Sequence, residues 1–174
     1  MSLLVKHSDV IMAQGTALFM SLSLLRALNK YYDLVERATT NPAIVAPSEL
    51  NFVPGPGDDL ESMIWAITYA ITLHHQGSLR GSDMARYQRR VVNNFYGSLS
   101  YSGLADKRKI MVLGGIDNLA DEPEEWIPDP AQHKWFRRAM ALVASQSMSL
   151  ANLSIEPITF GAFDALCDEF ITEE

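Results

Sequence analysis

The sequence has little cysteine, no basic excess and no long apolar run. A single cysteine, Cys167, excludes an internal disulfide, which is typical of a reducing compartment. The formal net charge is −7, so the basic surface that duplex binding requires is missing and no nucleic acid partner is expected. The most apolar stretch, Met63 to Leu73, is too short to span a bilayer. The first residues also lack the pattern of a signal peptide. We therefore expect a soluble intracellular protein, cytoplasmic or nuclear, that does not bind membranes.

What remains is an ordinary globular composition. Hydrophobic residues make up 48% and charged residues 20% of 174 residues, which is enough for one domain with its own core, spanning 1–174. Two short basic clusters, at 86–90 and 107–109, are interpreted as solvated helix faces. Cys167 falls in an apolar helical pattern and is predicted to be a small core residue.

Helical spacing of apolar residues dominates the chain, and no strand-like alternation is present. Helices are predicted over 17–37, 58–76, 83–96, 131–150 and 159–172, whereas 107–113 is compatible with helix or strand. Loops are predicted over 39–57, 97–103 and 121–130, where breakers or polar residues gather. Asp58, Asp83 and Thr159 are the predicted caps of helix starts, and Gly77 of a helix end. The fold class is therefore all-α.

The segment 58–76 is predicted to be the central helix. Its apolar residues lie on nearly all sides, which indicates a helix buried nearly all round. The carboxylates of Asp58 and Asp59 lie at its start, where the helix dipole favours negative charge.

Two short segments resemble the helical C-lobe of protein kinases. The first is Gly15-Thr16 followed by Phe19-Met20-Ser21, which is similar to the end of the kinase activation segment (15–23 here). The second is Asp59-Leu60-Glu61-Ser62, which is similar to the start of the central kinase helix in casein kinase 1-like and fungal-type protein kinases. The long linker between the segments is more like the fungal-type family. The resemblance implies a C-lobe-like domain with peripheral helices over 83–172, and it marks Gly15, Thr16, Phe19, Met20, Asp59, Glu61 and Ser62 as the motif positions.

The resemblance does not extend to the catalytic parts. A kinase needs a glycine-rich loop, a strand lysine, a catalytic-loop aspartate and an Asp-Phe-Gly. The sequence contains no Asp-Phe-Gly and no lysine strand, and there is no room for an ATP-binding N-lobe before Gly15. Gly55-Pro56-Gly57 lacks a preceding strand and a lysine, and Asp58-Asp59 would repel a phosphate. His7-Ser8-Asp9 only faintly resembles a catalytic loop. No catalytic, cofactor-binding or metal-binding residue is therefore expected, and ATP and Mg would be cofactors only if the missing lobe exists. In the family, Asp59 would hold the catalytic loop and Thr16 would help to close the substrate site. In this chain we predict instead that Asp59 caps the helix and that Thr16 makes a hydrogen bond within its loop.

Other candidate positions are interpreted as structural. His74-His75 and His133 lack the further ligands that a metal site requires. The acidic residues around Trp126 form a loop that is more typical of solvated structure than of a calcium site. Ser21, Ser23 and the segment 98–102 are marked as phosphorylation sites only by their expected exposure.

Two functional hypotheses follow. The first is a degenerate, pseudokinase-like domain without catalysis, acting as a protein-binding module or self-associating through apolar surface exposed near residues 1–25. The alternative is that the chain is the C-terminal fragment of an active fungal-type serine/threonine protein kinase whose ATP-binding part is missing. A weaker third possibility is an unrelated helical scaffold in which both motifs are coincidental.

Overall fold

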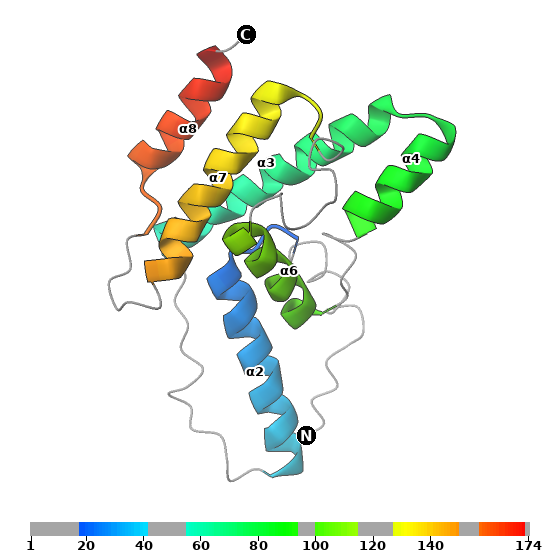
Figure 1. Ribbon diagram of the computed structural model, residues 1–174. Coiled ribbons are helices and arrows are strands. Elements are labelled where there is room, and N and C mark those ends of the chain that lie inside the picture. Colours follow the sequence, from blue (N-terminus) through cyan, green and yellow to red (C-terminus); the bar gives the residue numbers. More distant parts are fainter. Residues whose placement is uncertain (1–17, 42–54, 94–99, 115–126, 150–156, 173–174) are drawn as a thin grey trace.

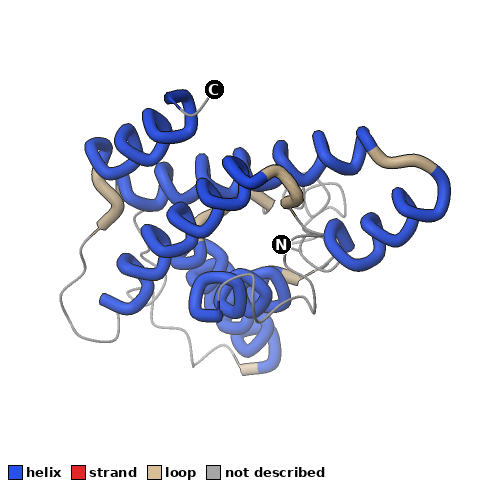
Figure 2. The backbone as a smooth tube through the Cα atoms, turned by 45° about the horizontal axis from the view of Figure 1, so that its top comes forward, coloured by secondary structure: helices blue, strands red, loops and turns tan. Residues whose placement is uncertain are grey.

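The computed structural model describes residues 18–41, 55–93, 100–114, 127–149 and 157–172, and in these ranges it is all-α, with no strand (Figures 1 and 2). This confirms the predicted fold class. The helices are α2 (Leu22–Thr40), α3 (Pro56–Ser78), α4 (Gly81–Tyr87), the π-helix η2 (Gln88–Val92), α6 (Tyr101–Gly114), α7 (Pro130–Ser149) and α8 (Phe160–Thr172).

The long helix α3 is the element around which the others are arranged (Figure 1). The helices α2, α4, η2 and α7 all contact it, and α8 packs against α7 on the far side. The chain turns back after α3, so that α4 and η2 lie beside its C-terminal end. The helices α2 and α6 form a second packed pair, and α2 extends away from the other helices (Figure 1).

Helix α3 begins earlier than predicted, and its start contains one half of a capping box, made by Asp58. The helix starts at Pro56, with Gly55 as its N-cap, so Asp58 is its third residue and not its cap. The Asp58 carboxylate accepts a hydrogen bond from the backbone N–H of Gly55 over 2.8 Å, as the N3 residue of a capping box does. Proline is favoured at the first helical position because its missing N–H would have no partner there. The Gly-Pro-Gly segment, predicted as loop, thus forms the first turn of the helix.

Gly57 is required by a close approach of two other segments. A Cβ at this position would lie 3.0 Å from both the Gln146 side chain and the Pro157 ring, and 3.3 Å from the backbone nitrogen of Ile158. The absence of a side chain at Gly57 therefore allows α7 and the segment before α8 to pack onto the start of α3.

The prediction that α3 is buried nearly all round is wrong. Its buried face includes Leu60, Ile64 and Trp65, but Met63 is 50% and Leu73 40% exposed. Apolar residues therefore lie on both the buried and the exposed side of the helix, and the polar residues Glu61 and Thr68 occupy part of the buried side. The helix also continues through Gly77 to Ser78, and its C-cap is Leu79.

The described core has two parts. The larger combines apolar side chains of α3, the α4–η2 segment, α6, α7 and α8. The smaller lies between α2 and α6 and contains Leu22, Leu25, Leu104 and Ala105. The apolar surface expected near residues 1–25 is therefore not found at Leu22 or Leu25, because α6 covers them; residues 1–17 lie outside the described ranges. The exposed apolar residues of α2 are farther along, at Tyr31, Tyr32 and Val35.

Several local predictions can now be compared with the structure. Thr159 caps α8 as predicted, since its hydroxyl accepts from the N–H of Ala162 over 3.2 Å. Asp83 does not cap α4, whose N-cap is Arg80. The segment 107–113 is helical and belongs to α6, which begins at Tyr101, within the predicted loop.

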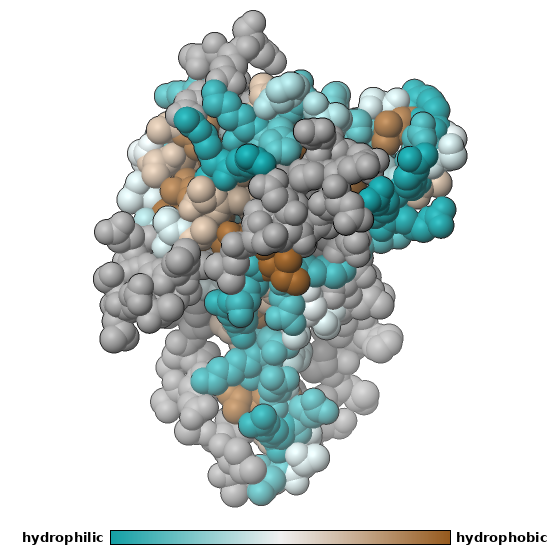
Figure 3. Space-filling model, viewed as in Figure 1, coloured by the Kyte–Doolittle hydropathy of each residue, from teal (hydrophilic) through white to brown (hydrophobic). Residues whose placement is uncertain are grey.

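Cys167 is half-buried and packs against the larger core, as predicted. Burial raises the pKa of its thiol, and Asp164 and Asp168 raise it further. Within the described residues, no helix has the length and apolarity needed to cross a membrane. On the face drawn in Figure 3, hydrophilic residues dominate along α2 and hydrophobic ones form small separate areas. The acidic residues 121–125 and Trp126 lie outside the described residues.

Candidate functional site

The start of α2 and the start of α3 are joined through Asp58. Ser21 is the N-cap of α2, and its hydroxyl accepts from the N–H of Leu24 over 3.1 Å. The same hydroxyl donates to Asp58 Oδ1 over 2.8 Å, and the Ser23 hydroxyl donates to that oxygen as well. One carboxylate therefore accepts from the N-cap residue of α3 and from two hydroxyls at the start of α2.

Glu61 makes the second connection between the two helices, from inside the protein. It is only 1% exposed. Its Oε1 accepts from the backbone N–H of Leu22 over 2.7 Å and from Trp65 Nε1 over 3.0 Å, and its Oε2 accepts from Gln146 Nε2 over 3.2 Å. A carboxylate at the N-terminus of α2 also faces the positive end of that helix dipole.

Gln146 extends this connection to the last helix. Its Oε1 accepts from the backbone N–H of Ile158 over 2.9 Å, just before α8 begins. We call Glu61, Trp65, Arg108 and Gln146 the Glu61 network. Its contacts connect α3 with the start of α2, with α6 and with the end of α7. Through Gln146 they also reach the segment just before α8.

Arg108 supplies the positive charge of the Glu61 network. Its guanidinium lies over the Trp65 ring, 4.5 Å from the ring centroid, in a cation–π contact. It also donates to the backbone carbonyl of Leu18. The indole of Trp65 is therefore held at its edge by Glu61 and on its face by Arg108.

The Glu61 carboxyl has a raised pKa. Burial is the largest cause, since desolvation disfavours the charged form, and Asp58 adds to it. The hydrogen bonds from Trp65 and Leu22 and the charge of Arg108 act in the opposite direction without cancelling it. Because Glu61 is out of contact with solvent, its chemistry is that of a fixed internal acceptor.

The first kinase-like segment is described only from residue 18 onward. Phe19 is half-buried and its ring meets Tyr69 of α3 edge-on, with centroids 5.6 Å apart. Met20 is half-buried and packs on the smaller core between α2 and α6. Gly15 and Thr16 lie outside the described residues, as do His7, Ser8 and Asp9.

The residues of the second segment lie on different sides of α3. Ser62 is half-buried and its hydroxyl donates to the backbone carbonyl of Asp58 over 2.8 Å. Asp59 is exposed in the first turn of α3. The structure therefore brings Glu61 together with the first segment, whereas Ser62 bonds within α3 and Asp59 faces solvent. The capping contact predicted for Asp59 is made by Asp58.

Arg108 and Gln146 are members of the network that the sequence did not reveal. Arg108 was interpreted as part of a solvated basic cluster, but it is buried. It follows Leu104 by four residues and precedes Val112 by four, so it lies in the apolar stripe of α6. That spacing was the available signal.

Ser21 is fully buried, which corrects the interpretation of this residue as an exposed phosphorylation site. His74 is exposed, and His75 and His133 are half-buried. Among the described residues, no group of three or more His, Cys, Asp or Glu side chains is placed to hold a metal ion.

A scan against protein-family models, a search of curated proteins and a search of solved structures each returned no match.

Proposed function

We propose that the chain is a kinase C-lobe-like helical module that acts by binding protein and not by transferring phosphate. The observation that carries this proposal is the pair of contacts between the two kinase-like segments, Ser21 to Asp58 and Leu22 to Glu61. The segments are separated by some forty residues of sequence. In a kinase-type lobe, the end of the activation segment would be expected to pack against the start of the central helix. The contacts that Ser21 and Leu22 make with the start of α3 support the proposal for this reason.

The non-catalytic part of the proposal rests on chemistry. Phosphoryl transfer needs a lysine, two metal-binding groups and a catalytic aspartate placed around ATP. The sequence offers no Asp-Phe-Gly and no strand lysine. Glu61, the one strongly buried carboxylate of the motif, is engaged as a structural acceptor by three donors.

For the binding surface we propose the outer part of α2. Tyr31, Tyr32 and Val35 are each about two-fifths exposed on a helix that extends away from the other helices (Figure 1). Tyr31 and Tyr32 also meet edge-on, and Tyr32 stacks on Tyr101 at 5.5 Å. Rigid aromatic side chains are enriched in the centres of protein interfaces.

Sedimentation of the purified chain over a wide concentration range tests the binding surface. We expect self-association that weakens in the double variant Tyr31→Ser, Val35→Ser. Met63→Ser is the matched control, because Met63 is an exposed apolar residue on another helix. A chain that stays monomeric throughout, or one in which the control behaves like the double variant, would contradict the proposed surface.

Calorimetry with Mg-ATP tests the absence of catalysis separately. We expect no binding at micromolar nucleotide and no transfer of labelled phosphate. Binding in that range would favour the alternative, that this chain is the C-terminal part of an active fungal-type serine/threonine kinase. An in-frame lysine strand and Asp-Phe-Gly in the DNA upstream of Met1 would support the same alternative.

A further inference from the structure

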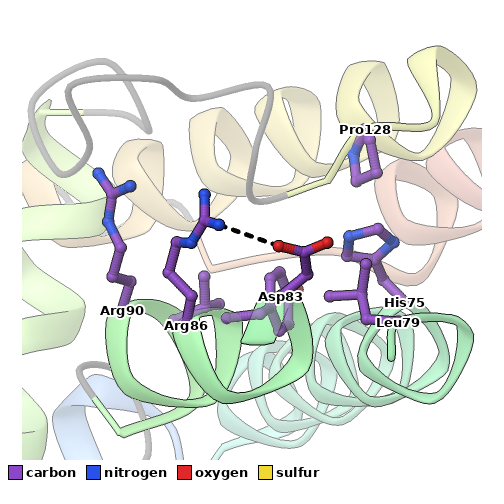
Figure 4. Close-up of a pocket in the computed structure, with 8 residues that line it drawn as sticks. His75, Leu79, Asp83, Arg86, Arg90 and Pro128 are labelled. Atoms are coloured by element: carbon purple, nitrogen blue, oxygen red, sulfur yellow. Dashed lines mark hydrogen bonds and ion pairs between the residues drawn. The ribbon is translucent and has the colours of Figure 1, made fainter. Parts of the chain in front are cut away.

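A pocket of about 190 Å³ lies where the C-terminal end of α3 meets α4 and η2, away from the Glu61 network (Figure 4). It is lined by residues from the end of α3, from α4 and η2, and by Pro128, which lies just before α7. The lining residues are His75, Leu79, Asp83, Arg86, Tyr87, Arg90, Val91 and Pro128.

One part of the pocket is basic. Arg86 and Arg90 extend in the same direction from one side of the α4–η2 segment (Figure 4), as residues four apart on a helix do. Arg86 Nη2 is paired with Asp83 Oδ1 at 2.9 Å. A guanidinium carries five N–H donors in a planar fork, so this pairing still leaves Arg86 able to donate to a second anion.

The basic charge of the pocket lies on its α4–η2 wall, whereas Asp129 follows the lining residue Pro128 on another wall. The segment 80–93 contains four arginines (Arg80, Arg86, Arg89 and Arg90) and one acidic residue, Asp83, within a chain of net charge −7. An anionic ligand is therefore drawn to this part of an otherwise acidic molecule.

The rest of the pocket is apolar. Leu79, Tyr87, Val91 and Pro128 line it, and the His75 imidazole meets the Tyr87 ring edge-on, with centroids 4.8 Å apart. Burial lowers the pKa of His75, with a smaller contribution from its neighbour His74, and both favour the neutral imidazole. His75 thus adds a ring and a neutral hydrogen-bonding group to the wall.

The α-helix α4 continues as a π-helix along this wall of the pocket. Residues 88–92 form a π-helix, and the backbone N–H of Asn93 bonds to the carbonyl of Gln88, five residues back. Two residues of this wide turn, Arg90 and Val91, line the pocket. Such turns are rare because their hydrogen bonding is less favourable, and they occur frequently at functional sites.

We propose that this pocket binds a small organic anion, with a single ring or a branched apolar body and one carboxylate or phosphate group. Arg86 and Arg90 bind the anionic group, and the body of the ligand lies against Leu79, Tyr87 and His75. The volume fits this class, since a cavity of about 150 Å³ holds a benzene ring and drug-sized ligands need about 300 Å³ or more.

NMR titration of the full chain with phenyl phosphate, benzoate and inorganic phosphate tests the proposal. We expect saturable shifts at Leu79, Tyr87 and Val91 with one of the two aryl anions, and binding about tenfold weaker or worse for inorganic phosphate. Comparison of phenyl phosphate with benzoate then identifies the preferred anionic group.

Variants locate the binding to the pocket. Arg90→Gln and Arg86→Gln should each weaken binding of the better aryl anion about tenfold. Arg89→Gln removes the same charge from a neighbour that is exposed, as Arg86 and Arg90 are, but does not line the pocket. It should change binding less than about twofold. Asp83→Asn should strengthen binding, because it removes the competing carboxylate. Thermal unfolding of each variant shows whether it is folded, and the two arginine variants provide independent measurements.

Three results would overturn the proposal. The first is no saturable shift with either aryl anion at millimolar concentration. The second is equal weakening by Arg89→Gln and Arg90→Gln, which would mean general charge attraction. The third is inorganic phosphate binding as tightly as the aryl anions, which would mean that the apolar wall contributes nothing.

Discussion

Replacing Glu61 by glutamine should remove a pH dependence from the stability of the fold. The Glu61 carboxyl is buried and its pKa is raised above the ordinary value of 4.5, mainly by desolvation. At pH values between the unfolded and the folded pKa, the folded chain holds a proton at Glu61 that the unfolded chain has lost.

The sign and the size follow from proton linkage. The stabilisation associated with the protonated carboxyl is fully present below pH 4.5 and is lost as the pH rises through the raised folded pKa. Within that window the free energy of unfolding falls by up to about 1.4 kcal/mol per pH unit for one proton. The Glu61→Gln variant has no proton to lose, so this contribution to the slope vanishes.

The variant also carries a cost that does not depend on pH. With its carbonyl facing Leu22 and Trp65, the new amide nitrogen faces Gln146 Nε2, which is also a donor. One unsatisfied buried donor costs about 1–3 kcal/mol. This shifts the whole stability curve and leaves its slope unchanged, so slope and offset can be separated.

The assay is urea unfolding followed by tryptophan fluorescence at a series of pH values from below 4.5 to neutrality. The measured quantity is the difference in unfolding free energy between the wild-type chain and the variant at each pH, in which the other titrating groups largely cancel. Asp59→Asn is the control, because Asp59 is an exposed carboxylate on the same helix. Its difference should stay within about 0.5 kcal/mol throughout.

A difference that does not change with pH would refute the reasoning. It would mean that the hydrogen bonds and Arg108 fully compensate for the burial of Glu61. A difference that changes in the opposite direction would mean that they overcompensate, so that the carboxyl is more acidic in the folded chain.

Substitutions at four further positions test the packing of the helices. Gly57→Ala should destabilise the fold by about 1–3 kcal/mol, because its Cβ would meet two neighbours at 3.0 Å. Gly77→Ala, where nothing lies within 4 Å, should stabilise α3 by about 0.5–1 kcal/mol; chemical denaturation compares the two, and equal effects would contradict the close approach. Ser21→Ala should lower the free energy of unfolding by about 1–2 kcal/mol in the same measurement, because it removes the N-cap of α2 and the hydrogen bond to Asp58. An effect near zero would contradict the role of Ser21 in connecting α2 with α3. Arg108→Met should cost about 1–3 kcal/mol, since it removes the hydrogen bond to the Leu18 carbonyl and the cation–π contact with Trp65. Arg108→Lys should recover part of this loss; full recovery would show that the planar guanidinium contributes nothing beyond its charge.

The helices were largely predictable because their signal is local. The periodicity of apolar residues in 58–76 and 159–172 is sufficient to place α3 and α8, and Thr159 is a cap in both prediction and structure. Helix starts were less predictable. At α3 the proline and glycine residues were read as breakers, although Pro56 is favoured in a first helical turn.

The candidate site was only half predictable, because its partners are distant in sequence. Glu61 was marked by its motif, but its partner Gln146 is 85 residues away, and no local pattern pairs them. Arg108 was misread because a basic triplet normally marks a solvated face. Met63 and Leu73 were misread for the opposite reason, since apolar residues are common on protein surfaces and do not by themselves indicate burial.

The Glu61 network also bears on how the motif Asp59-Leu60-Glu61-Ser62 should be interpreted. A helix cap needs only local partners, and the capping of α3 is provided by Asp58 through Gly55. Glu61, in contrast, accepts from donors on α2 and α7 as well as on its own helix. A buried carboxylate without these partners would cost several kcal/mol, so its burial is stable only once the helices have assembled. The glutamate of the motif therefore specifies tertiary structure. This role needs only the donors that α2, α3 and α7 supply to its carboxylate.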